Sequence, residues 1–98
     1  MKLSIAKFYA AASSNYTVGR TSPIRIITVH HTAANNDTLR YLWGDPARNG
    51  SSHFFVHQDY IEQYVDTNDT AWTNTCWKSN CESISIEVNG NWQNGYYN

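Results

Sequence analysis

The stretch from Ile24 to Ala34 constrains the fold of this chain more than any other part of the sequence. Its first half is rich in β-branched residues, which suit a pleated, half-buried strand. Two histidines, His30 and His31, stand at the end of that run. Because successive side chains of a strand point to opposite faces, His30 and His31 face in opposite directions. At most one of them can belong to a site on one side of a sheet.

A second strand is predicted over residues 83–88, where polar and apolar residues alternate. Ile84, Ile86 and Val88 define an apolar face, and Glu87 lies on the opposite face with two serines. A carboxylate on a strand of a mainly buried sheet is unusual unless its face lines a cleft. Glu87 is therefore a candidate site residue.

The other segments predict an α/β fold with a mixed central β-sheet flanked by helices. Leu39, Leu42 and Trp43 have helical spacing, and the preceding Asn35-Asn36-Asp37 offers N-cap candidates. The sequence further predicts a helix or extended arm over residues 1–16 and a loop over residues 15–20. It also predicts a β-hairpin over residues 53–65 and a polar connection over residues 66–80. The order strand, helix, hairpin, loop, strand favours a mixed sheet with a helix packed on it.

Composition limits the classes of partner. With 98 residues, 41% of them hydrophobic and 14% aromatic, the chain is expected to form one domain, residues 1–98, with a modest core. The formal net charge of −1 gives no electrostatic case for nucleic acid or an anionic membrane. No apolar run approaches the roughly 18 residues of a membrane span. Lys7 interrupts the N-terminal apolar residues, so we expect synthesis in the cytoplasm without a cleavable signal.

Several residue types could carry chemistry, and each has a plainer interpretation. His30 is a candidate metal ligand or an ordinary half-buried histidine. Glu87 suits a general base that activates water, or a solvated strand carboxylate. His53 and His57 lie four apart on a strand, roughly 13 Å from one another, so they cannot bind one ion together. Aromatic residues such as Trp72 could stack on sugar rings or could be core and rim.

Two cysteines, Cys76 and Cys81, allow three interpretations. They could form a short-loop disulfide, remain an inert reduced pair, or supply the nucleophile of a cysteine–histidine hydrolase. The last is disfavoured, because both lie in a polar segment without a predicted helix N-terminus to lower the pKa of a thiol.

The order of the motifs is more informative than any one of them. The sequence resembles zinc-dependent N-acetylmuramoyl-L-alanine amidases of the type-2 family, related to peptidoglycan recognition proteins, and phage and prophage endolysins in particular. The similarity covers most of residues 15–90 and rests on Asn15-Tyr-Thr-x-Gly-Arg20, Ile27-Thr-Val-His-His-Thr-Ala33, Ser52-His-Phe-Phe-Val56, Ile61-x-Gln-x-Val65, Asp69-Thr-Ala-Trp72 and Ser83-Ile-Ser-Ile-Glu-Val88.

This resemblance implies roles for four residues. His30 matches a zinc ligand, Glu87 the catalytic glutamate, and His53 and Trp72 positions that line the substrate groove. The reaction implied is hydrolysis of the amide joining N-acetylmuramic acid to the L-alanine of the stem peptide. The implied cofactor is Zn²⁺, the partner is bacterial cell-wall peptidoglycan, and the place of action is the cell wall after release.

The sequence departs from the family pattern in two places. Trp72 is followed by Thr73, where relatives commonly have histidine. The family's remaining zinc ligands, a second histidine and a later Asp or Cys, are expected outside this chain. Three hypotheses follow: an amidase completed by a further segment, a peptidoglycan-binding module that does not hydrolyse, and a metal-free structural domain. An incomplete fold would also favour self-association or pairing with a complementary C-terminal segment.

Overall fold

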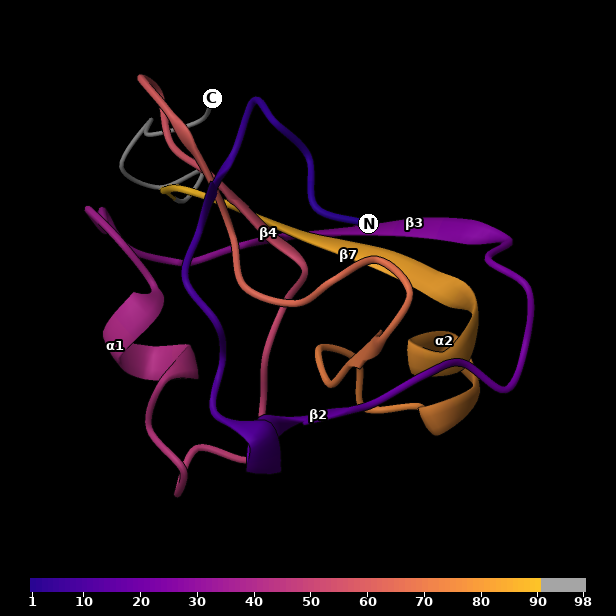
Figure 1. The fold of residues 1–98 in the computed structure, drawn as a ribbon. Coiled ribbons are helices and arrows are strands. Elements are labelled where there is room, and N and C mark those ends of the chain that lie inside the picture. Colours follow the sequence, from indigo (N-terminus) through magenta and orange to yellow (C-terminus); the bar gives the residue numbers. More distant parts are fainter. Residues whose placement is uncertain (91–98) are drawn as a thin grey trace.

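A computed structural model describes residues 1–90 and arranges them around a five-stranded mixed β-sheet (Figure 1). Its strand order is β1-β5-β4-β7-β3. The strands are β1 (Lys7–Phe8), β3 (Ile26–His31), β4 (Phe54–Val56), β5 (Ile61–Gln63) and β7 (Ser83–Val88). β3, β7 and β4 are parallel, β4 and β5 form the predicted antiparallel hairpin, and β1 is parallel to β5. The predicted mixed α/β architecture is thereby confirmed.

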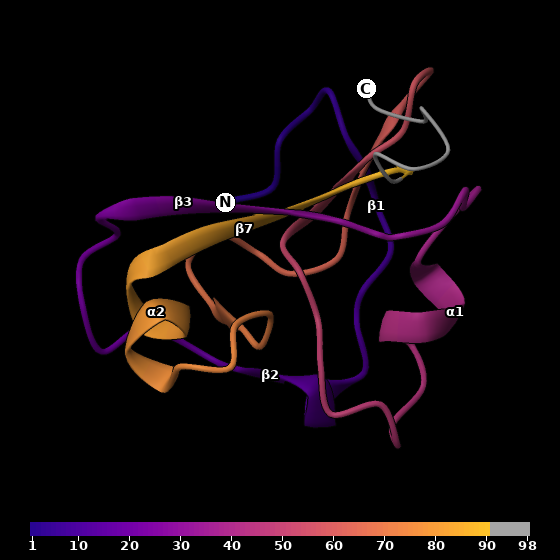
Figure 2. The same cartoon turned by 180° about the vertical axis from the view of Figure 1, so that it is seen from behind.

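The remaining elements lie on one side of this sheet (Figures 1 and 2). They are the 3-10 helix η1 (Ser13–Asn15), the helices α1 (Arg40–Trp43) and α2 (Trp77–Glu82), and a two-stranded antiparallel sheet of β2 (Tyr16–Thr17) and β6 (Thr70–Ala71). We call the side of the sheet that they cover the inner face, and the opposite side the outer face. None of the helices among residues 1–90 is long and apolar enough to cross a membrane.

The hydrophobic core lies against the inner face. Phe55 has no exposed surface and packs with buried residues from α1, the N-terminal arm and the segments around β5 and β6, namely Ala11, Leu39, Trp43, Tyr64, Val65 and Ala71. The indole N–H of Trp43 donates to the buried hydroxyl of Ser52, so this aromatic residue has its polar atom satisfied inside the core.

The two faces of β3 and β7 have an unexpected distribution of polarity. Ser83 and Ser85, on the inner face, are each only 1% exposed, whereas Ile27 and Val29 on the outer face are 66% and 63% exposed. The alternation itself is as predicted, because the register pairs Ile27 with Ile84 and Thr28 with Ser85. The polar residues are inside because α2 and the segment preceding it cover them and supply hydrogen-bond partners.

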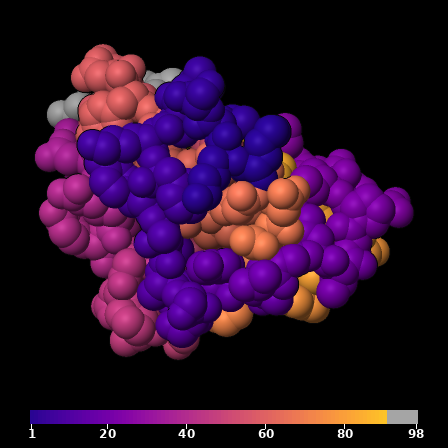
Figure 3. All heavy atoms as spheres, in the orientation of Figure 1, coloured from indigo at the N-terminus to yellow at the C-terminus, as the bar shows by residue number. Residues whose placement is uncertain are grey.

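The N-terminal residues form the extended arm, not the helix, of the two predicted alternatives. Tyr9 and Ala11 donate backbone hydrogen bonds to Gln63 and Tyr64, which continues the pairing of β1 with β5. The arm crosses one face of the molecule (Figure 3). Further toward the N-terminus, its side chains border an apolar groove of about 160 Å³ on the outer face, lined by Leu3, Ile5, Phe54, Val56, Ile61 and Ile86.

The cap predicted for α1 is wrong. The helix begins at Arg40 after Leu39, and no side chain from Asn35-Asn36-Asp37 caps it. Asn35 and Asn36 instead bind the side chain of Asn89, which follows β7, through its Nδ2 and Oδ1 atoms. These asparagines therefore tie the ends of β3 and β7 together.

The polar connection contains a helix that the sequence pattern did not predict. α2 spans Trp77–Glu82 and leads directly into β7, and its buried residues are Asn80 and Cys81. A helix of six residues is too short to show an apolar period. Its position matters for the site, because it fixes the start of the strand that carries Glu87.

Candidate functional site

His30 and Glu87 are direct neighbours across the pair of parallel strands β3 and β7. Register partners in a sheet project to the same face, so both side chains lie on the inner face. His31 pairs with Val88 and faces the other way, as the alternation predicts, and its Nδ1 accepts a hydrogen bond from the backbone N–H of Ala33. The structure thus brings together the two residues that the sequence assigned to catalysis and metal binding.

Glu87 is half-buried and lies between two register partners. One is His30 on β3, and the other is the core residue Phe55 on β4. Burial raises the pKa of the Glu87 carboxyl above its usual value, and the nearby His30 opposes part of that shift. A carboxylate in such surroundings holds a proton more readily than a solvated one. The environment therefore suits a group that accepts and returns protons.

The side chain of His30 is exposed but has a defined partner. Its Nε2 lies 3.0 Å from the side-chain oxygen of Asn74. Asn74 is held in turn by Asn80 of α2, whose Oδ1 accepts the backbone N–H of Asn74 at 2.7 Å and whose Nδ2 donates to the Asn74 carbonyl at 3.1 Å. Neither asparagine was a predicted site residue.

His53 lies beneath this surface and has no exposed area. Its Nδ1 accepts a hydrogen bond from the backbone N–H of Ser85 at 3.1 Å, and its Nε2 is 2.8 Å from the carbonyl oxygen of Asp69. Burial lowers the pKa of the imidazole to about 4, and the charge of Arg20 contributes to the same effect. In this structure His53 supports β7 from below. A residue that lines a groove would reach the surface, and His53 does not.

Arg20 is a second support under the same strand. Its guanidinium donates to three carbonyl oxygens, those of Thr67 at 2.8 Å, Cys81 at 3.2 Å and Ser83 at 3.0 Å. Burial lowers the pKa of Arg20, while Asp69 has an opposing effect. The residue joins the loop before β6 to the junction of α2 and β7.

Trp72 is half-buried and fixed at both ends. Its indole N–H donates to the hydroxyl of Thr17 in β2 at 2.9 Å, and its backbone pairs with Ser51. Thr73 directs its hydroxyl inward to the carbonyl of Ser51 and, at 2.8 Å, to the hydroxyl of Ser85. At this position the chain therefore has a structural hydrogen bond and no imidazole.

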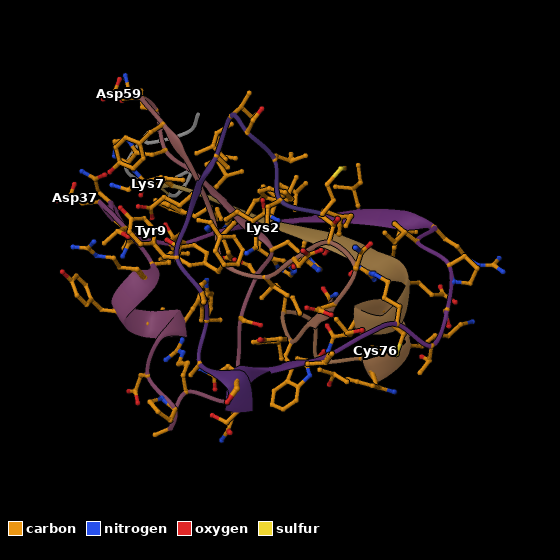
Figure 4. The ribbon with its side chains drawn as sticks, in the orientation of Figure 1. Lys2, Lys7, Tyr9, Asp37, Asp59 and Cys76 are labelled. Carbon is orange, nitrogen blue, oxygen red and sulfur yellow. The ribbon has the colours of Figure 1, made fainter. Side chains whose placement is uncertain are left out.

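Both cysteines are free thiols in this structure, with Cys76 exposed and Cys81 buried. The prediction that no helix N-terminus lies near them is wrong, since Cys76 is the residue that precedes α2 (Figure 4). Hydrogen bonds from Ser79 and from the backbone of Lys78 lower the pKa of the Cys76 thiol. These groups are not an imidazole, so the cysteine–histidine interpretation gains no support from them.

A comparison with protein families decides the classification. The family model for N-acetylmuramoyl-L-alanine amidase matches residues 19–98. The chain belongs to this amidase family. Its match includes β3, β7 and the inner face, which carry His30 and Glu87.

Solved structures of similar fold agree with membership of the amidase family. A mutant endolysin from Bacillus subtilis is 26% identical, with a TM-score of 0.73 and coverage of 90% of this chain. The catalytic domain of XlyA is also 26% identical, with a TM-score of 0.72 and 86% coverage. A mutant form of PlyL, 21% identical with a TM-score of 0.72, shares the fold. A search of curated proteins gave no match.

The amidase chain spans 62%, 60% and 59% of the lengths of these three structures. This matters for the metal that family resemblance implies. Catalytic zinc centres have three protein ligands. Residues 1–90 contain no group of three His, Cys, Asp or Glu side chains that could hold an ion. The described residues therefore do not by themselves fit a zinc centre, and His30 stays a predicted ligand.

Proposed function

We propose that residues 1–98 form one amidase-like domain that carries the general base of a peptidoglycan hydrolase. The bond cleaved is the amide between N-acetylmuramic acid and the L-alanine of the stem peptide. The observation that supports this proposal most strongly is the register of β3 and β7, which sets His30 beside Glu87 on the inner face. Family membership supports the choice of bond, and the similarity to endolysins supports the cell wall as the place of action.

Glu87 is the catalytic residue in this proposal. Amide hydrolysis needs a base to take a proton from the attacking water and an acid to give a proton to the departing amine. One carboxyl group can do both in turn, and the raised pKa of Glu87 favours the protonated state that the second step requires. The products are a free carboxylate on the lactyl group of the muramic acid and a free amine on L-alanine.

Zinc remains the cofactor implied by the family, with His30 as its ligand in this chain. Because the described residues lack a three-ligand group, no step of the proposal depends on a metal held by them alone. Trp72, half-buried beside β2, remains the candidate for contact with substrate. His53 has a supporting role in the proposal, through Ser85 of β7.

A second function is favoured by one observation. The inner face of β3 and β7 carries one histidine among the described residues, which is too few for the three-ligand zinc centre of a hydrolase. A domain of this kind would bind peptidoglycan through the same surface without cleaving it. The two functions predict different outcomes in one experiment.

The experiment measures binding and cleavage separately on purified cell walls. The 98-residue chain is incubated with dye-labelled walls in the presence of ZnCl₂, sedimented to measure binding, and assayed for released dye and for new L-alanine amines. The comparison is wild type, Glu87→Gln and the control Glu82→Gln, which changes a carboxylate at the end of α2.

Hydrolysis by wild type and Glu82→Gln, with loss in Glu87→Gln and unchanged sedimentation, supports the amidase. Binding by all three variants with no release of amines supports the non-hydrolytic module or an amidase that requires a further segment. Failure of the chain to bind walls contradicts both functions and leaves the metal-free structural domain.

A further inference from the structure

Asn74 has one contact that the proposed reaction does not use. Its side-chain oxygen lies 3.0 Å from Nε2 of His30. A carboxamide oxygen can only accept a hydrogen bond, so Nε2 of a neutral His30 must carry the proton. The lone pair of the ring is then on Nδ1.

The side-chain amide of Asn74 has a second contact. Its nitrogen lies 3.4 Å from the hydroxyl of Ser83, at the beginning of β7. With the nitrogen facing Ser83 and the oxygen facing His30, each amide atom has a partner of suitable type.

The backbone of Asn74 is fixed from below. Asn80, a buried side chain of α2, binds both the N–H and the carbonyl of Asn74, and its Oδ1 also accepts the N–H of Thr73 at 3.2 Å. The contact with His30 therefore starts from an anchored loop. An exposed imidazole without such a partner would exchange between rotamers and tautomers.

We propose that Asn74 is a positioning residue, which orients the His30 ring by accepting Nε2–H so that Nδ1 is the nitrogen presented to the inner face. The inference rests on the proposed function only in taking that face as the catalytic one. The contact joins the loop before α2 to β3, and it is present in the chain without a bound metal or substrate.

The test is an NMR measurement on the ¹⁵N-labelled 98-residue chain at a pH where His30 is neutral. Long-range ¹⁵N–¹H spectra report which ring nitrogen is protonated, and exchange broadening reports how fast the ring proton leaves. The variants are Asn74→Leu, which removes the acceptor, Asn74→Asp, which keeps an oxygen, and the control Asn68→Leu in an exposed turn.

We expect wild type, Asn74→Asp and the control to show the Nε2–H form with slowed proton exchange. Asn74→Leu should exchange this proton about three- to tenfold faster and populate the other tautomer more, since one hydrogen bond contributes free energy of that order. These signals do not depend on amidase activity, so a chain that fails to hydrolyse cell walls can still confirm the role of Asn74.

Two results would overturn the inference. One is an Nδ1–H tautomer as the main form of His30 in wild type, which needs no variant and holds even if Asn74→Leu does not fold. The other is identical tautomer populations and exchange rates in wild type and a folded Asn74→Leu.

Discussion

The backbone N–H of Ser85 donates a hydrogen bond to Nδ1 of His53 across 3.1 Å. The ring must therefore be neutral with its proton on Nε2, which faces the carbonyl oxygen of Asp69. Protonation at Nδ1 would break the bond to β7 and would place a charge where no exposed surface exists. One buried imidazole thus makes the stability of this domain depend on pH.

We expect the free energy of unfolding to fall as the pH decreases from 6.5 to about 4. The folded state keeps the pKa of His53 at about 4, whereas the unfolded chain takes up a proton near 6.5. The free energy of unfolding is therefore highest above pH 6.5, where His53 is neutral in both states. It decreases progressively between pH 6.5 and about 4, by at most about 3 kcal/mol. Urea unfolding at a series of pH values measures this slope. His53→Gln should flatten it, whereas His57→Gln, in the hairpin turn, should not.

Glu87→Gln should increase stability at neutral pH. Burial raises the pKa of the folded carboxyl, so ionised Glu87 destabilises the folded state above that pKa, and the effect disappears as the pH falls and the group is protonated. Thermal unfolding of wild type and variant at pH 7 and pH 4 tests the sign. Glu82→Gln is the matched control, and a wild type that is more stable than Glu87→Gln at pH 7 contradicts the prediction.

Arg20→Met should destabilise the domain by about 3 kcal/mol, because three carbonyl oxygens lose a charged donor. Arg20→Lys keeps the charge but cannot reproduce a planar fork, so an intermediate loss is expected. Chemical denaturation measures both. Arg25→Met, at an exposed position, should change stability by less than about 0.5 kcal/mol. A Lys variant as stable as wild type would show that the fork geometry is unimportant.

The two faces of the sheet should respond differently to loss of apolar surface. Phe55→Ala removes a fully buried ring from the core and should cost about 3–5 kcal/mol. Ile27→Thr changes a residue on the outer face that is 66% exposed and should cost less than about 1 kcal/mol. Denaturation midpoints of the two variants give the comparison, and similar losses would mean that the outer face is covered in solution.

Zinc uptake by an amidase that includes this chain should depend on His30 and not on His31. The two histidines are adjacent in sequence but project from opposite faces of β3. Elemental analysis after dialysis against ZnCl₂ should show stoichiometric metal lost in His30→Ala and retained in His31→Ala. Stoichiometric zinc in His30→Ala would remove this residue from the ligand set.

Strand periodicity predicted the most important features of the site. Alternation alone separated His30 from His31 and placed Glu87 on the polar face of its strand, and the structure confirms both. The hairpin and the short helix near Trp43 were also predicted correctly. These features depend on local patterns, which a single sequence contains.

The support of the site was not predictable in the same way. Asn74 and Asn80 come from a polar segment without any period, and their importance arises from hydrogen bonds between α2, its preceding loop and β3. The family resemblance predicts that His53 lines the substrate groove, whereas the structure buries it completely. Residue type and family position do not reveal how much of the chain covers a side chain. Burial of Ser83 and Ser85 likewise follows from tertiary contacts that override their polarity.

The exposed isoleucine and valine of β3 have a practical consequence for work on this domain. β3 ends the described strand order, and an apolar strand in that position invites precipitation and edge-to-edge assembly at high concentration. Ile27 and Val29 point away from His30, so replacing both with threonine keeps β propensity and leaves the inner face unchanged. The same period of two that positions the candidate catalytic residues thus allows a more soluble form to be engineered on the back of the same strand.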